Sequence, residues 1–89
     1  MVLLFEGIEV QIHKIFDNLL VVFKEFGLGL ENVVSVWVFL IDFYGDYACF
    51  NVVYVSYFFE GKCPVRICIG IIGLVCYVLV EIDFIVCWL

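Results

Sequence analysis

The only arginine of this 89-residue chain, Arg66, stands inside the apolar run "KCPVRICIG". A guanidinium group is a planar donor that can hold a carboxylate through two parallel hydrogen bonds. Two carboxylates, Glu81 and Asp83, stand in a second apolar run, "VLVEIDFIV". These residue types allow two kinds of chemistry. Arg66 could bind an anionic ligand, or it could form a structural ion pair with Glu81 on a neighbouring strand.

The sulfur and imidazole groups form no metal or redox motif. The cysteines, at positions 49, 63, 68, 76 and 87, include no CxxC pair, and His13 is the only histidine. An odd number of cysteines without a secretory signal favours reduced and mostly buried thiols. We therefore expect no metal site. We also expect no disulfide between Cys63 and Cys68, which are too far apart on an extended segment.

Composition and charge spacing favour a soluble, cytoplasmic protein. The chain is 67% hydrophobic. Its longest charge-free stretches, residues 67–80 and 47–59, are nevertheless shorter than the roughly 20 apolar residues of a membrane-spanning helix. The start, "MVLLFEGIE", lacks the basic region of a signal peptide. The net charge of −6 and the scattered basic residues disfavour nucleic-acid binding. So many apolar side chains in so short a chain predict an oligomer.

The apolar pattern over residues 9–26 predicts an amphipathic helix. The side chains that share its apolar face are Ile12, Phe16, Leu19, Phe23 and Phe26. Their spacing is that of successive helical turns. Gly27 follows directly, where a left-handed residue ends many helices.

The rest of the chain predicts strands around a second helix. Residues 32–41 are apolar and β-branched, which is typical of a strand covered on both faces. Asp46 is expected to cap a helix over residues 47–59, whose aromatic residues Tyr54, Tyr57 and Phe58 we interpret as core. Two further strands, 65–72 and 77–88, flank a turn near residues 73–76, and "MVLLF" is a terminal strand. The order predicts an α+β fold, with two helices on one face of a mixed sheet and an apolar open face that meets other subunits.

Five segments in this order resemble the RidA/YjgF family of reactive-intermediate deaminases. They read "GIEVQIHKIFDNL", "GLGLENVVSVWVFLID", "DYACFNVVYVSYF", "PVRIC" and "GIIGLVCYVLVEIDFIV". The resemblance runs from residue 7 to residue 88 and implies one chorismate-mutase-like domain over residues 1–89. Family members carry further N-terminal strands with a tyrosine and a serine in the site, and these we expect to be missing or truncated here. Ile67 and Val75 also depart from the family pattern, which has Ser or Thr and proline there.

The resemblance also implies a function. Family members are homotrimers that hydrolyse enamines and imines such as 2-aminoacrylate to 2-keto acids and ammonia in clefts between subunits, without a cofactor. Carried over residue by residue, Arg66 would hold the carboxylate of the imine or keto acid and Glu81 would direct water at the imine carbon. Asn51 and the main-chain N–H of Cys68 would line the cleft, and Asp83 would brace Glu81. The alternatives are a non-catalytic binding protein for keto or amino acids and, against the acidic charge, a ribonuclease that inhibits translation.

The hypothesis makes one demand on geometry within the chain. If residues 65–72 and 77–88 form a hairpin, a loop with an even number of residues keeps Arg66 and Glu81 on one face of the sheet. A two-residue loop at positions 73 and 74 would place them directly opposite each other. An odd loop would send them to opposite faces.

Overall fold

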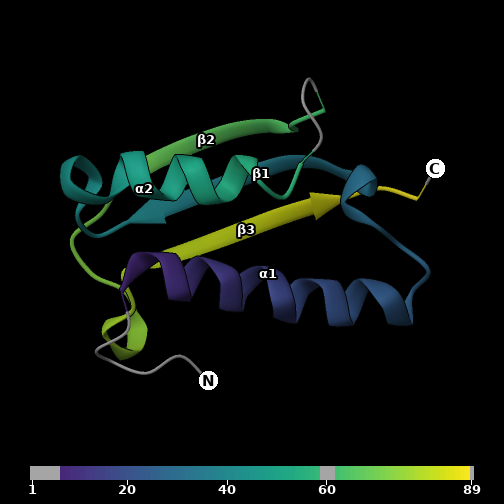
Figure 1. The fold of residues 1–89 in the computed structure, drawn as a ribbon, viewed down its shortest axis with the longest axis horizontal. Coiled ribbons are helices and arrows are strands. Elements are labelled where there is room, and N and C mark those ends of the chain that lie inside the picture. Colours follow the sequence, from purple (N-terminus) through teal and green to yellow (C-terminus); the bar gives the residue numbers. More distant parts are fainter. Residues whose placement is uncertain (1–6, 59–61, 89) are drawn as a thin grey trace.

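The computed structural model describes residues 7–58 and 62–88, in which two helices pack on a three-stranded sheet (Figure 1). The elements are α1 (Ile8–Glu25), the 3₁₀ turn η1 (Leu30–Asn32), β1 (Val33–Leu40), α2 (Phe43–Val55), β2 (Val65–Gly70), the 3₁₀ turn η2 (Val75–Tyr77) and β3 (Val80–Val86). The predicted α+β class and the order of these helices and strands are confirmed. The predicted strand at residues 1–5 lies outside the described residues.

Helix α1 forms where the apolar period predicted it. The side chains that it buries are Ile8, Gln11, Ile12, Phe16 and Phe23. Gly27 has a left-handed φ of 68°, as predicted. The N–H groups of Leu28 and Gly27 donate to the carbonyl oxygens of Phe23 and Lys24 at 2.9 and 3.3 Å, a pairing that satisfies the last carbonyls of a helix. Phe26, predicted on the buried face, is instead 58% exposed because it is the capping residue.

Helix α2 begins four residues earlier than predicted, and the assignment of Asp46 as its N-cap was wrong. Asp42 is the N-cap, since its Oδ1 accepts the N–H of Gly45 at 3.0 Å. Gly45 therefore belongs to the first helical turn and does not form a separate turn. Asp46 lies in the same turn, where burial and then the charge of Asp42 raise the pKa of its carboxyl group.

The sheet has the strand order β2-β1-β3, with β1 in the centre. Strand β2 runs parallel to β1 and β3 runs antiparallel to it. The predicted hairpin between the last two strands is therefore wrong. Helix α2 serves as the crossover that parallel strands require, which takes β2 to one edge of β1 and leaves the other edge for β3. The connection after β2 crosses the end of β1, where the N–H of Ile71 donates to the carbonyl oxygen of Leu40 at 2.9 Å.

Both helices cover the same face of the sheet. The core between them is formed by Ile8, Ile12, Phe16 and Phe23 of α1, Phe50, Val53 and Tyr54 of α2, Phe58 after it, and Val33, Val36, Val38, Leu40, Val80 and Ile82 of the sheet. The opposite face was predicted to be apolar and free of helices. In the described part of the chain it is open, and it exposes Trp37 and Ile67. This uncovered apolar face agrees with a chain that packs against further copies.

Two amide side chains hold the two ends of strand β3 in place. The Asn32 Nδ2 donates to the carbonyl oxygen of Cys87 at 3.1 Å, and its Oδ1 accepts the N–H of Gly29 at 2.9 Å. At the other end, the buried Gln11 accepts the N–H of Leu79 through Oε1 at 2.7 Å. No helix among residues 7–58 and 62–88 combines the length and the apolar character needed to cross a membrane.

Candidate functional site

Arg66 lies against the aromatic face of helix α2. It pairs with the buried Val36 in the β1–β2 register, so its side chain projects from the helix-covered face of the sheet. The guanidinium carbon lies 4.8, 5.7 and 5.9 Å from the ring centroids of Tyr54, Phe50 and Tyr47. One guanidinium nitrogen, Nη2, donates to the hydroxyl of Tyr47 at 3.1 Å. Three rings and one hydrogen bond therefore hold the cation.

The expected alternative for Arg66, a structural ion pair with Glu81, is not formed. The only ion pair within 4.0 Å among residues 7–58 and 62–88 joins His13 to Glu9. Two ionisable groups near Arg66, the Tyr54 hydroxyl and the Cys68 thiol, stay neutral at physiological pH. Burial raises the pKa of the Tyr54 hydroxyl to about 12 and also raises the pKa of the Cys68 thiol, although the charge of Arg66 acts in the opposite direction on both. Half-buried Arg66 thus has no anionic partner in the described chain.

Glu81 lies on the other side of the sheet. It pairs with Phe39 in the β1–β3 register, and both residues face away from the helices. Asp83 pairs with Trp37 and shares this face, two residues along the strand. Glu81 and Asp83 are both exposed, so the described chain does not desolvate the Glu81 carboxylate.

The structure does not bring Arg66 and Glu81 together within one chain. Their partners on β1, Val36 and Phe39, are three residues apart, which is about 10 Å along a strand. Strand β1 also lies between β2 and β3, which adds about 10 Å across the sheet. The side chains point to opposite faces. The predicted arrangement on one face, and with it the requirement for an even loop, was wrong because the two strands are not neighbours.

Two further predicted site residues lie on the elements that carry Arg66 and its aromatic partners. Cys68 follows Arg66 by two residues on β2, so it shares the helix-covered face and pairs with Val38. Asn51 lies on α2, adjacent in sequence to Phe50 of the aromatic face, and is partly buried. Helix α2 and strand β2 thus carry three of the five predicted residues, whereas Glu81 and Asp83 lie on β3.

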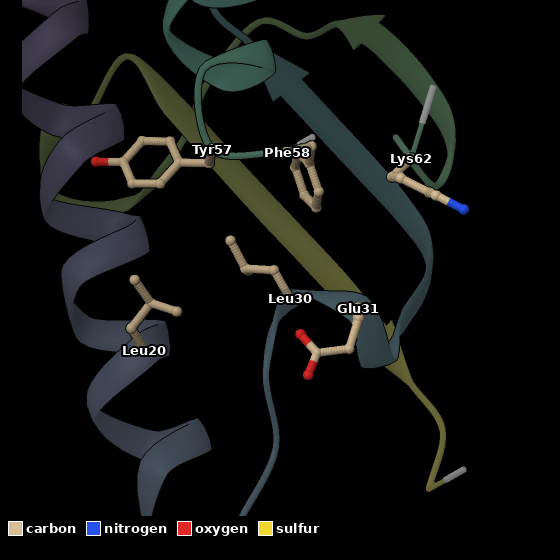
Figure 2. Close-up of a pocket in the computed structure, with 6 residues that line it drawn as sticks. All are labelled: Leu20, Leu30, Glu31, Tyr57, Phe58 and Lys62. Atoms are coloured by element: carbon tan, nitrogen blue, oxygen red, sulfur yellow. The ribbon is translucent and has the colours of Figure 1, made fainter. Parts of the chain in front are cut away.

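A pocket of about 630 Å³ opens elsewhere, between the end of α2 and the turn η1. Its lining residues are Leu20, Leu30, Glu31, Tyr57, Phe58 and Lys62. Figure 2 shows the apolar side chains facing a common space, whereas the Lys62 ammonium group points away from it. None of the predicted site residues lines this pocket, and Glu31 is the one carboxylate among its lining residues.

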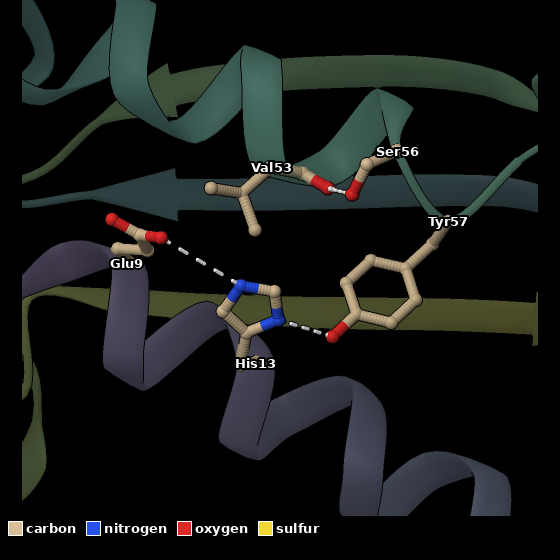
Figure 3. Close-up of polar contacts among 5 residues, drawn as sticks. All are labelled: Glu9, His13, Val53, Ser56 and Tyr57. Carbon is tan, nitrogen blue, oxygen red and sulfur yellow. Dashed lines mark hydrogen bonds and ion pairs between the residues drawn. The ribbon is translucent and has the colours of Figure 1, made fainter.

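The single histidine, on α1, contacts the segment that follows α2. Its Nδ1 shares a hydrogen bond with the hydroxyl of Tyr57, and its Nε2 lies 4.0 Å from Glu9 Oε1 (Figure 3). The Tyr57 ring stacks on Phe16 with ring centroids 4.1 Å apart. Burial, and then the charge of Asp17, raise the pKa of Tyr57, so its hydroxyl stays protonated at neutral pH. Among the described residues, no three His, Cys, Asp or Glu side chains are placed to hold a metal ion.

The sequence-based reasoning missed Tyr47. The prediction treated the aromatic residues of this helix as core, and for the buried Tyr54 and Phe58 this is confirmed. The spacing of residues 47, 50 and 54 nevertheless carried a signal, because positions i, i+3 and i+7 share one face of a helix. The side chain that packs against this aromatic face is the only guanidinium of the chain.

The fold and this arrangement define a RidA-type α+β domain. RidA from the Antarctic bacterium Psychrobacter superposes with a TM-score of 0.83 and 31% sequence identity, over 91% of this chain and 64% of that structure. Yeast Mmf1 gives a TM-score of 0.82 and 32% identity, over 91% of this chain and 63% of that structure.

The sequence matches the same group of proteins. Residues 2–88 match the family model described as endoribonuclease L-PSP, and the chain therefore belongs to this family, which is also called the YjgF/RidA family. A RutC family protein of Synechocystis is 44% identical over 84 residues, which are 93% of this chain and 64% of that protein. The chain thus spans less than two thirds of the length of these relatives.

Proposed function

We propose that this chain belongs to a cytoplasmic homotrimer that hydrolyses reactive enamines and imines of the 2-aminoacrylate type. The products are a 2-keto acid and ammonia, and the reaction uses no metal or organic cofactor. The observation that carries the proposal is the unpaired guanidinium of Arg66, half-buried against α2 without a carboxylate in the described chain. A guanidinium that no carboxylate neutralises keeps its positive charge and its free N–H donors available for an anionic ligand.

Each predicted residue has one task in this reaction. Arg66 binds the substrate carboxylate, and the main-chain N–H of Cys68 and the side chain of Asn51 border the reacting end. The enamine first tautomerises to the imine, whose C=N carbon is electrophilic. Glu81 accepts a proton from water as the oxygen bonds to that carbon, and returns a proton to the nitrogen. The hydroxyl group of the carbinolamine then gives up its proton and the nitrogen takes one up. The C–N bond breaks, ammonia leaves and the keto group remains.

The positions of Arg66 and Glu81 make a second copy of the chain necessary. They point to opposite faces of one sheet and are separated both along and across the strands. A ligand of three or four carbon atoms cannot span that distance. The active site of the proposal therefore takes Arg66 from one subunit and Glu81 from another. The exposed apolar residues on the open face, such as Trp37 and Ile67, supply a surface for that contact.

The test measures decay of 2-aminoacrylate, generated in the cuvette by a lyase, through release of the keto acid. Glu81→Gln should keep ligand binding and lose about 10²- to 10⁴-fold in rate, since the amide cannot accept the proton. Arg66→Lys should lose most binding, because an ammonium group lacks the planar fork. Parent-like turnover in Glu81→Gln would remove Glu81 from the reaction.

A second function, non-catalytic binding of small keto or amino acids, rests on the same Arg66. It is supported by the exposure of Glu81 in the described chain, where no group desolvates the carboxylate. Binding of pyruvate together with an absence of turnover at every tested pH would favour it. The ribonuclease named in the family description has less support, because a net charge of −6 opposes the phosphate backbone of RNA.

A further inference from the structure

Helix α2 presents a row of aromatic rings to the single arginine. Tyr47, Phe50 and Tyr54 occupy one helical face, and all three ring centroids lie within 6 Å of the guanidinium carbon. A row of rings packed against a planar cation restricts its tilt, because the attraction is strongest over the ring faces. They leave its rotation within the plane free.

The Tyr47 hydroxyl is the group that removes this rotation. It accepts a hydrogen bond from Arg66 Nη2 at 3.1 Å. The tyrosine is itself held in place, since its ring stacks on Phe43 with centroids 5.1 Å apart and an interplanar angle of 23°. Phe43 in turn packs closely against the backbone of Gly70 at the end of β2, where an added Cβ would lie 3.1 Å from the Phe43 Cβ. The hydroxyl thus occupies a fixed position relative to the strand that carries Arg66.

We propose that Tyr47 is a positioning residue, which fixes the guanidinium plane of Arg66 so that its remaining N–H groups form a ready-made fork for a ligand carboxylate. The proposal rests on the assignment of Arg66 as the carboxylate-binding residue. A free arginine would lose rotational freedom on binding, and a prepositioned one has already lost it. One hydrogen bond of this kind should change affinity about 3- to 10-fold.

The first test observes Arg66 without any ligand. The chain has one arginine, so its guanidinium NMR signals need no assignment. In the parent protein, slow rotation should give separate Nη resonances. In Tyr47→Phe, which keeps the ring and removes the hydroxyl, the resonances should merge. Tyr44→Phe is the matched control, because Tyr44 belongs to the same helix and is 96% exposed. Separate resonances that persist in Tyr47→Phe would overturn the proposal.

The second test measures binding of pyruvate by calorimetry. The Kd should rise about 3- to 10-fold in Tyr47→Phe and stay unchanged in Tyr44→Phe. Both variants should melt at the temperature of the parent. An unchanged Kd in Tyr47→Phe would overturn the proposal. A loss of affinity that a lower melting temperature explains would also overturn it, because the hydroxyl would then only stabilise the fold.

The last comparison separates this proposal from the function on which it rests. If Tyr47 acts through Arg66, adding Tyr47→Phe to Arg66→Lys should cost no further affinity, because the two changes remove the same interaction. Additive losses would show that Tyr47 acts independently and would overturn the positioning role only. If Arg66→Lys binds pyruvate as the parent does, the assignment of Arg66 fails and the role of Tyr47 fails with it.

Discussion

Two inactive variants of this chain should restore each other's activity when they assemble together. Arg66→Lys removes the carboxylate fork and Glu81→Gln removes the proton acceptor. In an assembly of either variant alone, every site is defective. Loss of the acid–base residue in Glu81→Gln should leave roughly 1% or less of the parent rate. If a site takes Arg66 and Glu81 from different copies, a mixed assembly contains sites that receive both intact residues.

The expected recovery follows from counting copies. In an equal mixture, the arginine is intact in half of the subunits and the glutamate is intact in the other half. With random assembly, about one quarter of the sites receive both, since the two choices are independent. Activity should follow the product of the two mole fractions and peak at equal amounts. A site within one chain would give no recovery at any ratio.

The assay combines co-refolding with the keto-acid readout. The variants are unfolded, mixed in different ratios and refolded, and native mass spectrometry checks that mixed assemblies form. The control replaces Glu81→Gln with the double variant Arg66→Lys/Glu81→Gln, which carries no intact arginine and should restore nothing. Mixed assemblies whose activity stays at the level of the single variants would refute a site shared between subunits.

Other predictions concern assembly, capping and thiol reactivity. Sedimentation equilibrium should give three times the chain mass of 10.3 kDa, because the open sheet face needs a partner, and a stable monomer would contradict this. Asp42→Ala should lower the free energy of unfolding by about 1 kcal/mol in denaturant titrations, since it removes the N-cap. Asp46→Ala should cost less, and the reverse order would contradict the cap. Iodoacetamide should modify Cys76 before Cys68, because burial raises the pKa of Cys68 and Cys76 is exposed, and all five thiols should be free by intact mass. Cys68 reacting first would contradict its burial.

Local patterns in the sequence predicted the elements that depend on local interactions. The apolar period of α1 and the glycine after it are properties of neighbouring residues, so that helix and its left-handed end were predicted correctly. Helix α2 shows the limit of such patterns. Asp42 and Asp46 both precede the residues predicted to be helical, and Gly45 between them is typical of a turn. Only the hydrogen bond from Gly45 to Asp42 decides which aspartate caps the helix.

Strand pairing could not be predicted in this way, because it depends on residues far apart in the sequence. The hairpin hypothesis assumed that consecutive strands are neighbours, whereas β1 inserts between β2 and β3. That single difference moves Glu81 to the face opposite Arg66. Arg66 itself was conspicuous as a lone cation in an apolar run. Tyr47 was not, since the functional importance of its hydroxyl depends on the partner that lies across from it.

The central place of β1 has a consequence during synthesis on the ribosome. Strand β1 is complete at Leu40, and its two neighbours are complete only at Gly70 and Val86. At 5–20 residues per second, the 46 residues from position 41 to position 86 take about 2 to 9 s. Throughout that interval at least one edge of a strongly apolar strand offers unpaired N–H and C=O groups to other nascent chains. Helix α1 is already made and can cover one face, but it cannot cover an edge. The yield of folded chain should therefore depend on how quickly translation delivers β3.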